Sequence, residues 1–193
     1  DKIIALLAMT MKEKGRLDGD TAVVTVMSNL GFIKYMEAQG INTEKTAVGD
    51  RYVYENMKEN DFMIGGEQSG HIIFRRFANT GDGILSALQF LQFVKKSGHP
   101  ASWFADRWKK YPSKLKAVHV EQKPPLESLD GFLSGVAEIE KTMNGKGRVI
   151  VRYSGTEPKL RVMVEGQDLE AIHRCADRIV EKINKRILEG LEG

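Results

Sequence analysis

The chain has 193 residues, of which 41% are hydrophobic and 28% are charged. That balance suffices for an ordinary core in one or two globular domains. The formal net charge of +3, with no basic cluster interleaved with aromatics, argues against nucleic acid as a partner.

Membrane and disulfide-dependent classes are also disfavoured. No apolar run approaches the roughly 20 residues that a membrane-spanning helix needs, and no secretory signal is visible. The single cysteine, Cys175, excludes an internal disulfide and a multi-cysteine zinc site. It lies in a helical apolar pattern, so we expect a buried or half-buried, inert thiol in a reducing cytoplasm.

Helices and strands alternate along the first half of the chain. The pattern predicts helices at residues 2–14, 30–39, 50–59 and 84–97. It predicts strands at residues 21–26, 46–48, 62–64 and 72–74. We therefore expect a three-layer α/β domain with a mixed, mainly parallel sheet.

The second half has a different order. A basic, proline-containing stretch at residues 107–115 separates it from the first, which predicts domains at residues 1–108 and 109–193. The elements expected after the boundary are strands at 115–121, 148–153 and 159–165, and helices at 128–143 and 169–188. This order indicates a small α+β domain with an antiparallel sheet packed by helices.

A glycine-rich polar loop joins two of the predicted strands. It reads Gly-Gly-Glu-Gln-Ser-Gly-His at residues 65–71. Glu67 and Ser69 offer a carboxylate beside a hydroxyl, a pair suited to vicinal sugar hydroxyls. His71 can donate to a ligand or titrate near neutral pH. The alternative is a glycine-rich turn with a structural histidine.

A second polar loop reads Arg-Tyr-Ser-Gly-Thr-Glu-Pro-Lys-Leu-Arg at residues 152–161. Arg152 and Arg161 supply planar forks that match phosphate oxygens. Gly155 can adopt a positive φ and lets backbone N–H groups converge on an anion, beside the hydroxyls of Ser154 and Thr156. The alternative is a tight hairpin with solvated arginines.

Together the two loops resemble the sugar-binding and phosphate-binding loops of the α-D-phosphohexomutases. Within that superfamily they are most similar to the bacterial phosphoglucosamine mutases, as are Val-Gly-Asp-Arg-Tyr-Val at residues 48–53 and the opening eight residues. The resemblance covers essentially the whole chain. It implies the third family domain at residues 1–108 and the fourth, C-terminal domain at residues 109–193.

Two motifs of the family do not occur in this sequence. Members carry a phosphoserine nucleophile in a Thr-Ala-Ser-His-Asn-type loop and Mg²⁺ in an Asp-x-Asp-x-Asp-Arg loop, in their first two domains. Here Asp-Gly-Asp at residues 18–20 is better explained as a turn, and Thr-Gly-Asp-Gly at 80–83 as a loop ending in a helix cap. The chain begins inside an apparent helix without an initiator Met. We therefore expect a truncated protein whose N-terminal domains are its partners.

The resemblance implies a cytoplasmic isomerase that interconverts glucosamine 6-phosphate and glucosamine 1-phosphate. It implies a phosphoserine enzyme, glucosamine 1,6-bisphosphate as the intermediate, and Mg²⁺ as the cofactor of the full-length protein. The product would feed UDP-N-acetylglucosamine and cell-wall peptidoglycan synthesis. This chain would recognise the phosphosugar and contribute no metal ligand, so we expect the isolated chain to be inactive.

The resemblance also implies roles for individual residues. Glu67 and Ser69 match residues that hold sugar hydroxyls, and His71 matches a histidine near the reacting oxygens. Gly49 and Asp50 match a substrate-contacting loop, although Asp50 is alternatively a helix N-cap. The residues that match the phosphate anchor, with Arg152 as its main cation, are Arg152, Ser154, Gly155, Thr156 and the flanking Arg161.

Two other functions stay open. The first is a phosphomannomutase or phosphoglucomutase of the same superfamily, because sugar choice depends on few contacts. The second is a non-catalytic phosphosugar-binding module, which the absence of the nucleophile and metal loops would suit.

Overall fold

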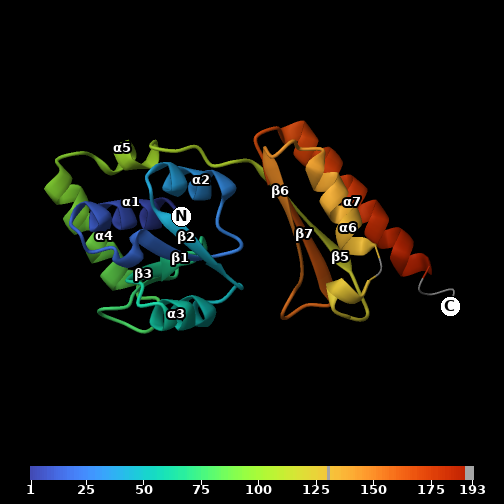
Figure 1. Ribbon diagram of the computed structural model, residues 1–193, viewed down its shortest axis with the longest axis horizontal. Coiled ribbons are helices and arrows are strands. Elements are labelled where there is room, and N and C mark those ends of the chain that lie inside the picture. The colour runs from blue at the N-terminus through green and yellow to red at the C-terminus, as the bar shows by residue number, and fades with distance from the viewer. Residues whose placement is uncertain (130, 190–193) are drawn as a thin grey trace. The chain divides into compact units, whose positions relative to one another are not determined.

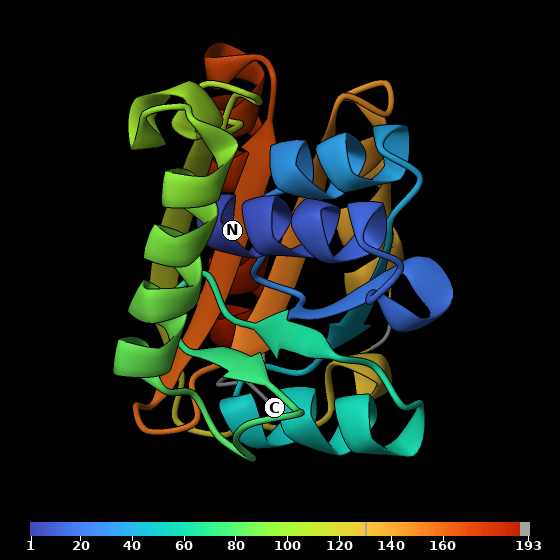
Figure 2. The same cartoon turned by 90° about the vertical axis from the view of Figure 1, so that its left-hand side faces the viewer.

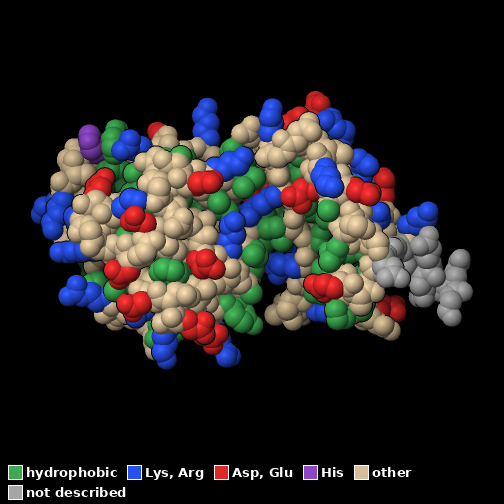
Figure 3. Space-filling view, in the orientation of Figure 1, with side chains coloured by type: hydrophobic (Ala, Val, Ile, Leu, Met, Phe, Trp, Pro, Cys, Tyr) green, Lys and Arg blue, Asp and Glu red, His purple; other side chains and the backbone are tan. Residues whose placement is uncertain are grey.

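The structure, a computed structural model, describes residues 1–129 and 131–189, with side chains as far as residue 185. The chain folds as two compact units, Asp1–Lys110 and a second that starts at Tyr111 (Figure 1). On the face shown in Figure 3, acidic and basic side chains are interspersed over each unit. No described helix is both long and apolar enough to cross a bilayer.

The first unit is built on a four-stranded sheet in the order β2-β1-β3-β4. Strands β1 (Thr21–Thr25), β2 (Asn42–Thr46) and β3 (Ile64–Gly66) run parallel, and β4 (Ile72–Phe74) is antiparallel to β3. The predicted mixed, mainly parallel sheet is confirmed. All five residues of β1 are buried, as expected for a strand in the middle of a covered sheet.

Helices cover both faces of this sheet. Figure 2 shows α1 (Lys2–Glu13) and α2 (Leu30–Ala38) on one side and α3 (Asp50–Glu59) on the other. Alternate side chains of β1 serve the two faces, because Val24 packs in the α1/α2 core and Val23 packs with the α3 residues Val53 and Met57. The three-layer architecture follows from this alternation.

Two further helices complete the unit. Helix α4 (Gly83–Ser97) ends at Gly98, whose φ of 72° is the left-handed conformation of a helix stop. Short helix α5 (Ala101–Ala105) follows Pro100 and was not predicted, since five residues carry no readable helical period.

Two of the predicted strands are placed wrongly. The strand expected at residues 46–48 is β2, four residues earlier, and the one expected at 62–64 is β3, two residues later. β2 is a half-exposed edge strand of Asn, Thr, Glu and Lys, so no apolar run marks it. β3 includes two glycines, which normally weaken a strand, so the sequence did not predict it there. Its position is determined by close packing of the glycines against neighbouring segments.

The second unit has a three-stranded antiparallel sheet in the order β5-β7-β6. The strands are β5 (Ser113–His119), β6 (Gly147–Tyr153) and β7 (Lys159–Gly166). Helices α6 (Phe132–Lys141) and α7 (Leu169–Glu189) lie on one face of it in Figure 1. The predicted antiparallel sheet packed by helices is confirmed, and Cys175 is buried in the core as expected.

The helix predicted at residues 128–143 is too long. The short 3-10 helix η2 (Leu126–Ser128) comes first, and α6 starts only after Gly131, which has a φ of 64°. A positive φ breaks the right-handed helical path, so the two segments cannot join.

A stability prediction follows from the packing of β3. A Cβ at Gly65 would lie 2.6 Å from Met57 Sδ, 2.7 Å from Val53 Cγ1 and 2.9 Å from the Val23 carbonyl oxygen. We expect Gly65→Ala to lower the free energy of unfolding of the first unit by about 1–3 kcal/mol through overpacking. Urea unfolding followed by tryptophan fluorescence measures this unit alone, because both tryptophans, Trp103 and Trp108, lie in it.

Gly83→Ala is the matched control, since a Cβ there meets nothing within 4 Å. We expect its unfolding free energy to stay within about 0.5 kcal/mol of the parent. Equal losses in the two variants would contradict the packing argument.

Candidate functional site

The sugar-loop candidates gather at one edge of the first sheet. Strands β1, β2 and β3 are parallel, so the segments that follow them, residues 26–29, 47–49 and 67–71, emerge at the same edge. The carboxyl edge of parallel strands is where α/β folds bind ligands. The topology thus places together loops that are distant in the sequence.

One hydrogen bond joins two of these loops directly. Glu67 Oε1 accepts from the backbone N–H of Gly49 at 3.1 Å, and the Glu67 side chain is only 12% exposed. Gly49 has a φ of 134°, a conformation that L side chains rarely adopt. The carboxylate is therefore fixed by one oxygen and keeps Oε2 as an acceptor for a ligand.

Ser69 and His71 stand beside this carboxylate. His71 Nδ1 lies 3.2 Å from Ser69 Oγ and 3.7 Å from Glu67 Oε2, while the ring remains 62% exposed. The loop is closed by the Glu67 N–H, which donates to the His71 carbonyl at 2.9 Å. The structure thus brings Glu67, Ser69 and His71 together, with His71 Nε2 left for a ligand.

Asp50 does not act as a helix N-cap. The N-cap of α3 is Gly49, and Asp50 is the first helical residue. Its Oδ2 instead accepts from Thr80 Oγ1 at 3.3 Å, which ties the start of α3 to the loop before α4. The alternative role that the sequence allowed for Asp50 is wrong, because Gly49 takes the capping position.

The loop before α4 is a part of the site that the sequence did not reveal. A Cβ at Gly81 would lie 3.1 Å from His71 Cβ, so this loop packs directly on the histidine. Asp82 caps α4 by accepting from the Leu85 N–H at 2.9 Å, which confirms the predicted helix cap. In the sequence, the turn-forming residues at 80–83 predicted a helix cap. They gave no indication that the loop contacts His71.

The segment after β1 stabilises the start of helix α2. Ser28 and Asn29 are fully buried, and Asn29 caps α2 by accepting from the Gly31 N–H at 3.0 Å. Because both side chains are buried, this segment offers a ligand fewer accessible groups than the neighbouring loops do.

The second candidate loop is the hairpin between β6 and β7. Ser154 is 4% exposed; its N–H donates to the Lys159 carbonyl at 2.8 Å, and its Oγ accepts from the Glu157 N–H at 3.3 Å. Gly155 does not use the positive φ that glycine allows, since it is not among the residues with positive φ. The hydroxyl of Ser154 and the Lys159 pairing close the turn, so no left-handed residue is needed there.

The tip of the hairpin nevertheless offers free donors. Gly155 and Thr156 are exposed, and within the described part of the chain their backbone N–H groups donate to no other residue. An incoming anion can therefore be met by backbone amides as well as by side chains.

The cations of this loop are not equivalent. Arg152 and Arg161 are direct partners across β6 and β7. Burial, and secondly the charge of Arg161, lowers the pKa of Arg152. Arg161 pairs with Glu157 Oε2 at 2.5 Å, whereas Arg152 has no carboxylate partner among the residues that the structure describes. This favours Arg152 over Arg161 as the cation that an anion meets.

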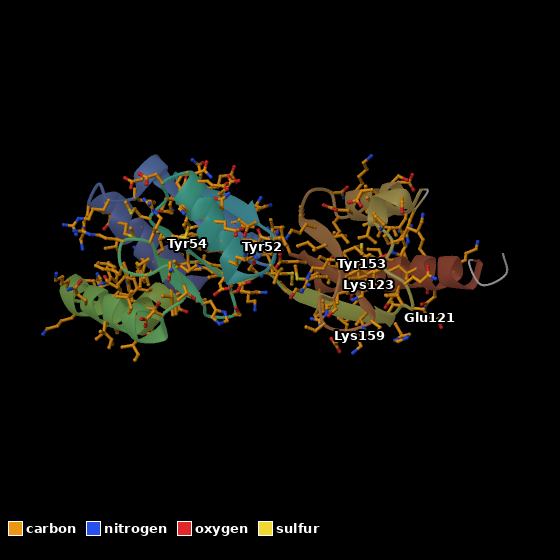
Figure 4. All side chains as sticks on the ribbon, turned by 90° about the horizontal axis from the view of Figure 1, so that it is seen from below. Tyr52, Tyr54, Glu121, Lys123, Tyr153 and Lys159 are labelled. Carbon is orange, nitrogen blue, oxygen red and sulfur yellow. The ribbon has the colours of Figure 1, made fainter. Side chains whose placement is uncertain are left out.

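Lys123 is another residue that the sequence did not single out. Its Nζ donates to the Ser154 carbonyl at 2.6 Å, and Figure 4 labels it beside Tyr153 in the second unit. The surrounding sequence, Glu-Gln-Lys-Pro-Pro at residues 121–125, did not predict this contact, because it joins residues that are 31 positions apart.

Metal-ligating residues do not cluster in the described ranges. No group of three His, Cys, Asp or Glu side chains lies together in residues 1–129 and 131–185. Asp18–Asp20 forms a single 3-10 turn, as expected, with Asp20 paired to Lys12 at 3.0 Å.

Two family profiles match the chain in succession. Phosphoglucomutase/phosphomannomutase, alpha/beta/alpha domain III, matches residues 1–111, and the C-terminal domain of the same family matches residues 115–182. The chain is 49% identical to the phosphoglucosamine mutase of Geobacillus thermodenitrificans over 97% of its own length, and 45% identical to that of Bacillus subtilis over 100%. It spans 42% of the length of each relative.

Solved structures of Aspergillus fumigatus N-acetylphosphoglucosamine mutase share the fold. Two of them have TM-scores of 0.84 and 0.82, with 21% and 20% sequence identity. The matches cover 97% and 95% of this chain and 43% and 46% of those chains. The second is a complex with GlcNAc-6P and magnesium.

A local prediction tests the bond between the two loops of the first unit. Glu67→Ala leaves the Gly49 N–H without its acceptor, whereas Glu67→Gln keeps a carbonyl oxygen there. A hydrogen bond to a charged group contributes about 1.5–3 kcal/mol, so we expect the Gly49 amide to exchange about 10- to 100-fold faster in Glu67→Ala. NMR-detected hydrogen exchange measures this, and an unchanged Gly49 rate would contradict the contact.

Proposed function

Because the chain belongs to the phosphoglucomutase/phosphomannomutase family, we propose that it supplies the third and fourth domains of a phosphoglucosamine mutase. The bacterial relatives at 45–49% identity carry that name. The reaction is the interconversion of glucosamine 6-phosphate and glucosamine 1-phosphate in the cytoplasm.

The observation that carries the proposal is the bond between Glu67 and Gly49 at the carboxyl edge of the sheet. It fixes a carboxylate whose second oxygen can accept from a sugar hydroxyl. The Ser69 hydroxyl, 3.2 Å from His71 Nδ1, provides a second polar contact within the same loop. Such a pair recognises hydroxyls that occupy similar positions when the sugar binds in either of two orientations.

The hairpin of the second unit anchors the phosphate that is not being transferred. Arg152 supplies a guanidinium fork, and the exposed amides of Gly155 and Thr156 supply neutral donors. A fixed anchor is needed in both orientations, because phosphoryl transfer draws mainly on positioning and charge stabilisation.

His71 is the residue of this chain that we place nearest the reacting oxygens. Ser69 and Glu67 orient the ring through Nδ1, while the exposed ring keeps Nε2 free to exchange a proton with a sugar hydroxyl. The Gly81 loop, packed against His71 Cβ, restricts the ring on its other side.

The covalent steps belong to residues outside this chain. A phosphoserine gives its phosphoryl group to the free hydroxyl of the substrate, which forms glucosamine 1,6-bisphosphate, and the serine then takes the other phosphoryl group back. A fungal relative binds magnesium, but the described residues of this chain do not form a metal site, so we assign Mg²⁺ to the rest of the protein.

An NMR titration of this chain with glucosamine 6-phosphate tests both loops. We expect saturable amide shifts at residues 67–71 and at residues 152–156, and inorganic phosphate should shift only the second set. Arg152→Gln should weaken binding of both ligands about tenfold or more, because a charge-assisted contact is lost.

Arg174→Gln is the control, since Arg174 is an exposed arginine of α7 paired with Glu170. It should leave both affinities unchanged. Shifts with inorganic phosphate alone would refute the sugar site, and parallel titrations with mannose 6-phosphate and glucose 6-phosphate rank the hexoses.

A kinetic prediction concerns the chain by itself. It carries neither a phosphoserine loop nor a described metal site, so we expect no conversion of glucosamine 6-phosphate above the uncatalysed rate. Coupled detection of glucosamine 1-phosphate measures this. Turnover by the purified chain would show that the chemistry resides in residues other than those we assign.

A further inference from the structure

A cavity of about 310 Å³ opens among helices α1, α2, α4 and α5 of the first unit. Figure 2 shows α4 beside α1, with which it is in contact. The volume lies in the range of about 300–1,000 Å³ that is usual for small-molecule sites. None of the residues that line the cavity belongs to the candidate loops at residues 47–50, 65–71 or 152–161.

The wall of this cavity is unusually rich in aromatic rings. Five of them line it: Tyr35, Phe93, Trp103, Phe104 and Trp108. The rings support one another, because the Phe104 centroid lies 4.9 Å from that of Phe93 and 4.7 Å from that of Trp103, both edge to face. Phe104 and Trp108 are each 8% exposed, whereas Trp103 is 37% exposed. The wall is therefore preorganised and presents apolar surface to a ligand.

The hydroxyl groups in the wall already have partners. Thr10 Oγ1 donates to the Leu6 carbonyl at 2.9 Å, and Ser97 Oγ donates to the Val94 carbonyl at 2.8 Å. The Tyr35 hydroxyl donates to a methionine sulfur at 3.1 Å. A polar ligand body would find few free donors here, so the wall favours an apolar or aromatic body.

The rim of the cavity is positive. Its charged lining consists of five exposed side chains, the cations Lys2, Lys14, Lys96 and Arg107 against the carboxylate of Glu13. Within the part of the chain that the structure describes, neither Lys14 nor Lys96 is paired with a carboxylate. Four cations against one carboxylate leave an excess of three positive charges, as large as the formal net charge of +3 of the whole chain. The cavity therefore attracts anions.

We propose that this cavity binds a small organic anion, whose apolar or aromatic body lies on the aromatic wall and whose acidic group faces Lys14 and Lys96. A carboxylate, a sulfonate or a phosphate ester satisfies the same requirement. A second copy of this chain does not, because it would bring the same excess of cations to the rim. This binding site goes beyond the proposed function and does not depend on it.

The two tryptophans of the chain give a direct test, because both line the cavity. Their indole N–H signals can be followed by NMR during titration with naphthalenesulfonate. Naphthalenemethanol and naphthylmethylammonium keep the same body and change only its charge. We expect saturable shifts of both indole signals, with the sulfonate bound about three- to tenfold tighter than the alcohol and the ammonium bound more weakly than the alcohol.

Two adjacent lysines of α4 supply a matched pair of variants. Lys96 lines the cavity and Lys95 does not. We expect Lys96→Gln combined with Lys14→Gln to weaken sulfonate binding about fivefold or more and to leave the alcohol unchanged, because only the charge contact is lost. Lys95→Gln should change the sulfonate affinity less than about twofold.

Trp103→Leu tests the aromatic wall separately from the charge. We expect it to weaken both the sulfonate and the alcohol about threefold or more, because ring contacts are lost for either ligand. The Trp108 indole signal reports the binding, and the dispersion of the amide spectrum shows that the first unit is folded.

Each result bears on one part of the inference. Equal affinities for the sulfonate and the alcohol, or equal losses in Lys95→Gln and the double variant, would overturn the selection of anions. Unchanged affinities in a folded Trp103→Leu would overturn the aromatic wall. Shifts at residues 152–156 without shifts of the indole signals would place the sulfonate on the hairpin and overturn the cavity as its site, and no saturable shifts at all would refute the proposal while leaving the proposed function intact.

Discussion

The first unit depends on the lack of side chains at two positions of β3, Gly65 and Gly66. Gly65 and Gly66 let β3 lie against β1 and α3, where a Cβ at Gly66 would come within 2.4 Å of the His71 carbonyl oxygen. These close contacts restrict the direction in which the backbone leaves the sheet after Gly66. That path delivers Glu67 to Gly49 and closes the loop on His71, so the packing of the core and the geometry of the site have one cause.

In the second unit the main constraint is electrostatic: two arginines face each other across the β6–β7 hairpin. Its hairpin carries Arg152 and Arg161 directly opposite each other on adjacent strands, although like charges in that position are destabilising. Burying Ser154 fixes the turn, and Glu157, three residues later, offsets the charge of Arg161, whereas Arg152 has no carboxylate partner among the described residues. The candidate sugar loop thus combines a carboxylate, a hydroxyl and an imidazole, whereas the candidate phosphate loop combines cations with exposed backbone amides.

Much of this fold is readable from the sequence, for reasons that particular elements show. The β-branched run in β1 and the apolar spacing of α7 produce buried faces with clear periods, and Gly98 ends α4 as a left-handed stop should. The polar edge strand β2 is different, because its register comes from pairing with β1 and not from its own residues. The same limit applies within the sites: Glu67, Ser69 and His71 could be grouped from their spacing, whereas the contacts of Gly81 and Lys123 arise only when distant segments fold together.

The backbone at Gly155 shows why a motif predicts chemistry better than conformation. Glycine in a loop invites a positive φ, yet here a serine hydroxyl and a backbone pair with Lys159 close the turn, and Gly155 leaves open space where a side chain would stand. The exposed amides that the glycine was expected to provide are present all the same, at Gly155 and Thr156. The proposed phosphate anchor depends on backbone donors without partners beside an arginine that has no carboxylate partner in the described part of the chain, and more than one backbone path satisfies that requirement. A Cβ at Gly155 would meet nothing within 4 Å, and its absence leaves the backbone at the tip of the hairpin open to close approach by a ligand.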